Sequence, residues 1–255
     1  MKITLSKILY YIEEYLFPSG CALCGRALLD IEETWYGLCR NCRTEIGIEE
    51  GERCEVCGRP LISEIGVCLP CRNGGAHSYD RIVCIFPYTG RFQKLLIAYK
   101  YGRSRALGNF FLEILKKALE LLPLQELKSP VLVPVPPRPG KIKRSGWDQV
   151  EFLAKLLDGE YRKAEKKALY GAENTPPGAF PVRRCLKRLP TKSQKELNRE
   201  MRKTNLAGKI RSKNAPKEAV LFDDVLTTGS TLDACAEALK KAGAEKVYGI
   251  CLFYN

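Results

Sequence analysis

Four pairs of cysteines carry the clearest metal-binding chemistry in the sequence. Eight of the twelve cysteines occur as Cys-x-x-Cys. Two intervening residues is the spacing of knuckles that turn both thiolates toward one tetrahedral ion. Four thiolates close the coordination sphere, so such an ion is structural rather than catalytic. The pattern therefore predicts two structural Zn2+ ions, held by Cys21, Cys24, Cys39, Cys42, Cys54, Cys57, Cys68 and Cys71.

The cysteine-rich segment repeats itself. Cys-x-x-Cys-Gly-Arg occurs at 21–26 and again at 54–59, and each copy leads to a second Cys-x-x-Cys followed by arginine. A repeat of this kind favours one zinc per unit, with Cys21, Cys24, Cys39 and Cys42 on the first ion and Cys54, Cys57, Cys68 and Cys71 on the second. Cross-braced pairing is the alternative. We expect a double zinc ribbon over residues 18–76.

A second set of residues could bind a phosphorylated sugar. Asp223 and Asp224 end a short apolar run, and small hydroxyl-rich residues separate them from a predicted helix. Hydroxyls and backbone N–H groups at a helix N-terminus form a phosphate cradle, whereas two carboxylates suit vicinal hydroxyls or a divalent metal. A ribose 5-phosphate offers both groups. The predicted cradle is Thr227, Thr228, Gly229, Ser230 and Thr231.

Alternating strands and helices must position these residues. Apolar runs predict strands at 82–86, 131–135, 219–223 and 247–253, and periodic segments predict helices at 91–99, 107–122, 148–157 and 231–242. Loops are expected at 136–146 and 224–230. Strands separated by helices indicate an α/β fold with a mostly parallel sheet flanked by helices. Ligands bind such sheets at the carboxyl ends of the strands, where the acid pair falls.

Asp223-Asp224-Val225-Leu226-Thr227-Thr228-Gly229-Ser230-Thr231 resembles the phosphoribosyl-pyrophosphate (PRPP) signature of type I phosphoribosyltransferases. The whole arrangement is similar to the ComF family, which joins a zinc ribbon to such a domain and is linked to DNA uptake. Three further segments also match the pattern of this family, namely Val133-Pro134-Val135-Pro136, Thr191-x-x-Gln194-x-x-Leu197 and Arg202-x-x-Asn205. The resemblance implies a type I phosphoribosyltransferase-like domain over 77–255. It assigns the ribose hydroxyls to Asp223 and Asp224 and the 5-phosphate to residues 227–231, with Mg2+ bridging pyrophosphate and ribose oxygens.

The resemblance also assigns the pyrophosphate to the basic loop after Val135. Its candidate residues are Arg138, Lys141, Lys143 and Arg144. The following segment, Ser145 to Gln149, departs from the family pattern by losing a basic residue and gaining Asp148. Residues 159–184 look like an insertion.

The ends and the charge of the chain suggest where it acts. Residues 1–17 predict an amphipathic helix packed on the protein, with a helix on a membrane surface as the alternative. Glu13 and Glu14 interrupt the segment and no small-residue cleavage site follows, so it is not a signal peptide, and it is too short and charged to span a membrane. Without an export signal, we expect a cytoplasmic protein, associated with the inner face of the membrane only through partners. The formal net charge of +13 favours anionic partners.

A basic segment points to nucleic acid. Residues 183–213 hold twelve Lys or Arg against two Glu. A groove for single-stranded DNA also needs aromatic side chains for stacking. The candidates are Tyr99, Tyr101, Trp147, Tyr161 and Tyr170.

Three functions compete at this stage. The first is a DNA-uptake protein that binds PRPP, single-stranded DNA and other uptake proteins. The alternative is an active phosphoribosyltransferase that acts on an unknown small-molecule acceptor without a nucleic-acid role. A zinc-stabilised adaptor on a relic fold is the third, and the intact acid pair argues against it.

Overall fold

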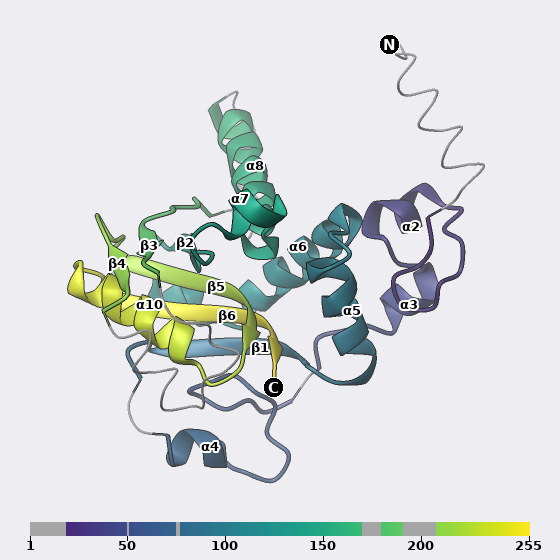
Figure 1. Ribbon diagram of the computed structural model, residues 1–255. Coiled ribbons are helices and arrows are strands. Elements are labelled where there is room, and N and C mark those ends of the chain that lie inside the picture. The colour runs from purple at the N-terminus through teal and green to yellow at the C-terminus, as the bar shows by residue number, and fades with distance from the viewer. Residues whose placement is uncertain (1–18, 50, 75–76, 170–179, 191–207) are drawn as a thin grey trace.

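A parallel sheet forms the centre of the protein. The computed structural model describes residues 19–49, 51–74, 77–169, 180–190 and 208–255 (Figure 1). Four parallel strands lie in the order β1-β6-β5-β2. They are β1 (Arg81–Pro87), β2 (Val131–Pro134), β5 (Glu218–Leu226) and β6 (Lys246–Tyr254). The predicted α/β class, a type I phosphoribosyltransferase-like fold with a zinc ribbon in front, is confirmed.

Helices cover both faces of this sheet. One face carries α5 (Gly90–Lys100), α6 (Arg105–Glu120) and α8 (Gln149–Leu169), with the short 3₁₀ helix η1 (Leu124–Glu126) after α6. The other face carries α10 (Ser230–Lys241) and an antiparallel hairpin of β3 (Leu186–Arg188) and β4 (Ile210–Ser212) (Figure 1). Ser104 caps α6 by accepting the N–H of Leu107, and nine residues of α6 are buried. The core therefore has two halves, one on each side of the sheet.

Three predicted boundaries were wrong. β5 runs through both acids to Leu226, because its register with β6 continues to Tyr254. The predicted loop 136–146 contains the short helix α7 (Lys141–Ser145). Helix α8 passes Gly159 and continues to Leu169, so the expected insertion at 159–184 begins as an extension of this helix. One glycine costs a helix only about 1 kcal/mol, and the residues after it are mostly good helix formers.

The second ribbon covers the free edge of β1. Its backbone carbonyl at Val56 accepts the N–H of Ile82 at 3.0 Å, and the side chain of Arg53 donates to the carbonyl of Cys84 at 2.7 Å. Gly58 packs so closely that an added Cβ would lie 2.3 Å from the carbonyl oxygen of Ile82. An unpaired edge strand is a template for aggregation, and here the ribbon occupies it.

The first ribbon docks elsewhere, on the helical face. It contains α2 (Ile31–Tyr36) and α3 (Arg40–Thr44), whereas the second ribbon contains α4 (Leu69–Arg72). Asn109 of α6 donates to the backbone carbonyl of Trp35 at 2.9 Å, and the hydroxyl of Tyr36 donates to Glu113. Two copies of one sequence repeat therefore contact different parts of the α/β domain.

Some predictions fall outside the described residues. They include the N-terminal helix over 1–17, and both the Thr191 to Leu197 and the Arg202 to Asn205 matches. The domain limits at 18–76 and 77–255 stay predictions. Within the described segments, no helix has the length and apolar character needed to cross a membrane.

Candidate functional site

The two ribbons build the same knuckle twice. In the first, Cys21 donates its N–H to the carbonyl of Arg26 at 2.8 Å and accepts from Gly25 at 2.9 Å. In the second, Cys54 and Gly58 make the equivalent bonds at 2.9 and 2.8 Å. Gly25 and Gly58 have φ of 75° and 65°, a left-handed conformation that strongly favours glycine. The Cys-x-x-Cys-Gly-Arg repeat is thus explained by local backbone geometry.

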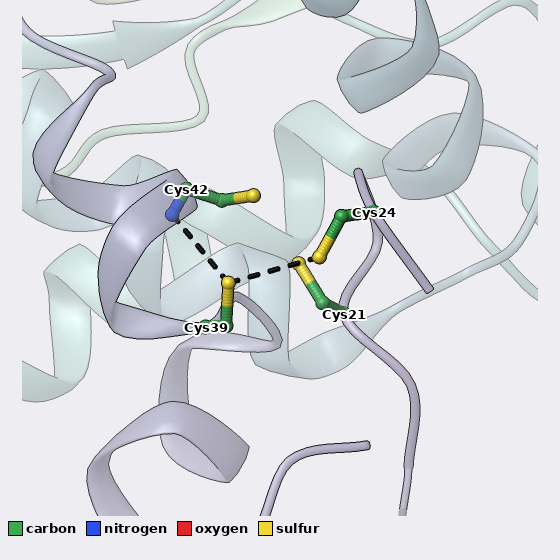
Figure 2. Close-up of side chains that lie close together, drawn as sticks. All are labelled: Cys21, Cys24, Cys39 and Cys42. Atoms are coloured by element: carbon green, nitrogen blue, oxygen red, sulfur yellow. Dashed lines mark hydrogen bonds between the residues drawn. The ribbon is translucent and has the colours of Figure 1, made fainter. Parts of the chain in front are cut away.

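The eight thiols gather in two groups, and the grouping is sequential rather than cross-braced. Within each group, all sulfur atoms lie within 4.8 Å of one another. The first group consists of Cys21, Cys24, Cys39 and Cys42, and the second consists of Cys54, Cys57, Cys68 and Cys71. Figure 2 shows the first group converging from the knuckle and from the start of α3. Cys39 and Cys68 occupy the N-cap positions of α3 and α4.

These groups fit zinc. The sulfur atoms of Cys24 and Cys39 lie 3.8 Å apart, and those of Cys57 and Cys68 lie 3.7 Å apart. A tetrahedron with Zn–S bonds of about 2.3 Å has an edge of about 3.8 Å. Four thiolate donors with no carboxylate or histidine among them leave no position for a reacting ligand. Two structural zinc sites are supported.

The acid pair lies at the carboxyl end of β5, inside the strand. Side chains of a strand alternate between faces, and Leu221 belongs to the core half beside α10 while Phe222 belongs to the half beside α6 and α8. The side chain of Asp223 therefore lies on the face of the sheet that α10 covers, and that of Asp224 lies on the face that α6 and α8 cover. The backbone N–H of Asp224 donates to the carboxylate of Asp223 at 2.8 Å, which keeps the two groups adjacent.

The two acids have different electrostatic surroundings. Burial, followed by the neighbouring charge of Asp224, raises the pKa of Asp223 well above its ordinary value. Burial acts on Asp224 in the same direction, but the ammonium of Lys100 lies 2.6 Å away and holds the pKa of Asp224 below its ordinary value. The amide of Gln149 also donates to Asp224. The pKa values of the two carboxyl groups are therefore displaced in opposite directions, which favours the negative charge on Asp224 over Asp223.

The predicted phosphate cradle forms a turn into α10. Gly229 occupies the N-cap position with φ of 75° and provides no side-chain cap. The hydroxyl of Thr228 accepts the N–H of Ser230 at 3.4 Å, and the other N–H groups of the first turn need acceptors, so this helix start is suited to an anion. The hydroxyls of Thr228 and Ser230 lie 2.8 Å apart. Thr227 is exposed, and Thr228 and Thr231 are half-buried.

The predicted pyrophosphate residues are not equivalent. Lys141, at the start of α7, donates to Asp148 at 2.6 Å and to the side-chain oxygen of Gln149 at 2.8 Å. Lys143 and Arg144 point to solvent, and Arg138 is half-buried. The acid that departs from the family pattern has a structural role, because Asp148 also accepts the N–H of Glu151 at 2.9 Å and so caps α8.

Comparison with known proteins agrees with this architecture. A family model described as a double zinc ribbon domain matches residues 12–72. The DNA utilization protein YhgH of Salmonella typhimurium is 26% identical over 235 residues, which cover 85% of this chain and 96% of that protein. The competence protein ComFC of Streptococcus pneumoniae is 25% identical over 243 residues, covering 89% of this chain and 96% of that protein. The chain is thus similar over most of its length to a DNA utilization protein and to a competence protein, in line with the resemblance to the ComF family.

Sequence patterns missed three residues near the acid pair or the phosphate cradle. Lys100 ends α5 and binds Asp224 from a point over a hundred residues away in the sequence, and no local pattern indicates such a contact. Arg59 donates to the carbonyl of Asn255 at 2.6 Å, beside the phosphate cradle. Arg188, the third, is buried on β3. Of the three, only Arg59 could have been found from the sequence, because it belongs to the repeated Cys-Gly-Arg.

Proposed function

We propose that this protein binds PRPP with Mg2+ at the carboxyl end of β5 and acts in DNA uptake, where it contacts single-stranded DNA. One observation supports the binding of PRPP. Two adjacent acids end β5, and the turn that follows them leads into α10 with two neighbouring hydroxyls, those of Thr228 and Ser230. The raised pKa of Asp223 favours a carboxyl group that can donate a hydrogen bond, and the lowered pKa of Asp224 favours a carboxylate that accepts one; both suit the hydroxyls of a ribose.

The remaining groups of PRPP also have counterparts. The N–H groups at the start of α10 suit the 5-phosphate, and the basic residues after β2 suit the pyrophosphate. Carboxylate and phosphate oxygens are ligands that Mg2+ prefers, and the ion would neutralise pyrophosphate as a leaving group. The chain's own residues orient the sugar and hold its charges.

Calorimetric titration of the zinc-loaded protein with PRPP and Mg2+ tests this site. We expect micromolar affinity, and a loss of at least 100-fold in Asp223→Ala with Asp224→Ala, since this variant removes both carboxyl groups and with them both ribose contacts. Lys217→Met is the control, because Lys217 is exposed at the amino end of β5. Equal affinity in the wild type and the double variant would refute the assignment.

DNA contact is supported by the described part of the basic segment. The hairpin of β3 and β4 exposes Lys187 and Arg211, which stand directly opposite each other, and Lys209 and Lys213 flank them. Like charges at opposite positions of a hairpin repel, and a polyanion relieves that repulsion. The relatives' names, DNA utilization protein and competence protein, also concern DNA.

One predicted stacking residue was wrong. Tyr99 is completely buried and donates its hydroxyl to the backbone carbonyl of Gln149 at 2.8 Å, so it cannot stack on a base. Tyr101 is 68% exposed and keeps that capacity. Tyr170 lies outside the described residues.

Charge reversal tests the DNA surface. Lys187→Glu with Arg211→Glu should weaken binding to a single-stranded oligonucleotide and reduce the salt slope by about 1.4, since each lost phosphate contact removes about 0.7. Lys217→Glu should change neither quantity. An unchanged slope in the double variant would remove the hairpin from the DNA surface.

An active transferase is the second candidate. Transfer at the anomeric carbon needs positioning and charge neutralisation more than a protein nucleophile, and the acid pair and cradle offer the first of these. Release of pyrophosphate from PRPP in the presence of bases and amines tests it. Release that depends on one acceptor and is lost in the Asp223/Asp224 double variant would establish catalysis.

A further inference from the structure

Arg188 is a buried cation whose hydrogen bonds are incomplete. It ends β3 and is only 9% exposed, whereas the preceding Lys187 faces solvent. Its Nε and Nη2 atoms are buried and find no hydrogen-bond partner among the residues that the structure describes. A buried charge without partners is strongly unfavourable, so proteins keep one where a ligand completes it. The other arginines of the basic segment that are described face solvent.

The path of the chain brings Arg188 to the ligand end of the sheet. Residues 181–183 run parallel to β2, with Leu132 bridged to Val182, the N–H of Leu132 donated to Pro181 and the N–H of Arg183 donated to Leu132, both at 2.9 Å. Arg188 lies six residues after Val182, and Arg138 lies six residues after Leu132, so the two arginines are equally far along the chain from this bridge. Arg188 therefore lies at the same end of the sheet as the acid pair and the basic loop.

The electrostatics agree with this position. Burial, and then the positive charge of Arg138, lowers the pKa of Arg188, while the carboxylate of Asp223 acts in the opposite direction. Arg138 and Asp223 are therefore among the groups whose charge acts on Arg188. Two guanidinium groups that repel each other are stabilised by an oxyanion between them, and the planar fork of arginine binds phosphate or carboxylate through two parallel hydrogen bonds.

We infer that Arg188 and Arg138 form an oxyanion site at the carboxyl end of β2, separate from the phosphate cradle at α10. The inference rests on the proposed function for its source of ligand. The oxyanion is either the diphosphate of PRPP or an anionic group on the acceptor. In both cases Arg188 contacts the ligand, whereas the exposed Lys143 and Arg144 contribute only charge.

Titration with inorganic pyrophosphate and Mg2+ tests the site without PRPP. Arg188→Met should weaken binding about 10- to 100-fold, and Arg188→Lys should restore part of it because the charge returns without the fork. Lys217→Met removes one exposed charge at the far end of β5 and should have no effect. Equal pyrophosphate affinity in the wild type and Arg188→Met would overturn the inference.

Two further experiments identify which molecule supplies the oxyanion and separate the oxyanion site from the proposed PRPP site. Saturation with PRPP should abolish pyrophosphate binding if the diphosphate of PRPP fills the site, and should leave an Arg188-dependent component if the acceptor does. Ribose 5-phosphate affinity should stay within about twofold in Arg188→Met, and an equal loss for both ligands would overturn the inference. If the wild type binds pyrophosphate through Arg188 but neither PRPP nor ribose 5-phosphate, the proposed function fails and the oxyanion site stands.

The ligand-free stability gives an independent readout. Because Nε and Nη2 lack partners, Arg188→Met should leave the melting temperature of the ligand-free protein unchanged or raise it. A structural arginine would show the opposite. A marked fall in the melting temperature of both Arg188→Met and Arg188→Lys would assign Arg188 to folding instead.

Discussion

The ion pair between Lys100 and Asp224 gives the sharpest test of the electrostatics. The pair is 2.6 Å long, and its side chains are 28% and 11% exposed. Lys100→Met keeps the length of the side chain and removes the ammonium. Asp224 would then be a buried carboxylate with the amide of Gln149 as its remaining side-chain donor, so its pKa should rise.

The expected loss follows from the burial of the pair. Removing one partner of a buried ion pair costs about 3 to 5 kcal/mol, and the partial exposure of Lys100 places this pair at about 3. For a chain of this size that corresponds to about 6 to 12 °C in melting temperature. The folded pKa of Asp224 is lowered, so the contribution of the pair is present above the unfolded pKa of about 3.9 and is lost as the pH falls through the folded value.

Urea unfolding between pH 3 and pH 8 measures this effect as the difference between the wild type and the variant, since both lose zinc alike when the thiolates protonate at the acid end. The difference between the wild type and Lys100→Met should be largest near neutral pH and should shrink toward pH 3. Lys100→Met with Asp224→Asn should recover about 2 kcal/mol relative to the sum of the single variants, because no unpaired charge remains. A pH-independent difference, or additive single variants, would refute the reasoning.

Three further predictions concern the acid pair and the second ribbon. Because its pKa is raised in the folded state, Asp223 stabilises the fold below its unfolded pKa of about 3.9, and this contribution is lost as the pH rises through the folded pKa. Asp223→Asn should therefore become more stable relative to the wild type in urea unfolding from pH 5 to pH 9. A difference in unfolding free energy that does not change with pH would contradict this. Gly58→Ala should cost at least about 2 kcal/mol in the same assay, since it combines a φ of 65° with a Cβ 2.3 Å from the oxygen of Ile82. Cys57→Ser should lower the zinc content by about one ion per chain in a dye-release assay, and loss of both ions would show that the ribbons are not independent.

Much of the fold was predictable because it follows local patterns. The apolar runs at β1 and β6 and the periodic residues of α6 match the structure closely. Boundaries that depend on neighbours were missed. β5 extends past Asp223 because β6 offers it hydrogen-bond partners, and α8 passes Gly159 because nothing in the residues after it stops a helix.

The site was predictable only where it is continuous in the sequence. The cysteine pairs, the acid pair and the cradle each lie within one short segment, and each is brought together as a unit. Lys100 contacts Asp224 from a distant segment, and Asp223 acts electrostatically on Arg188 from another; both interactions exist only once the sheet has formed. Patterns along the chain carry no information on such encounters.

Occupation of the β1 edge by the second ribbon makes metal supply a condition of solubility. The backbone bond from Ile82 to Val56 and the close packing of Gly58 last only as long as the knuckle around Cys54 and Cys57 keeps its shape. A chain made when zinc is scarce would expose a long apolar strand to its neighbours, and such strands pair between molecules. Cells starved of zinc should therefore accumulate this protein in inclusion bodies rather than as a folded metal-free form.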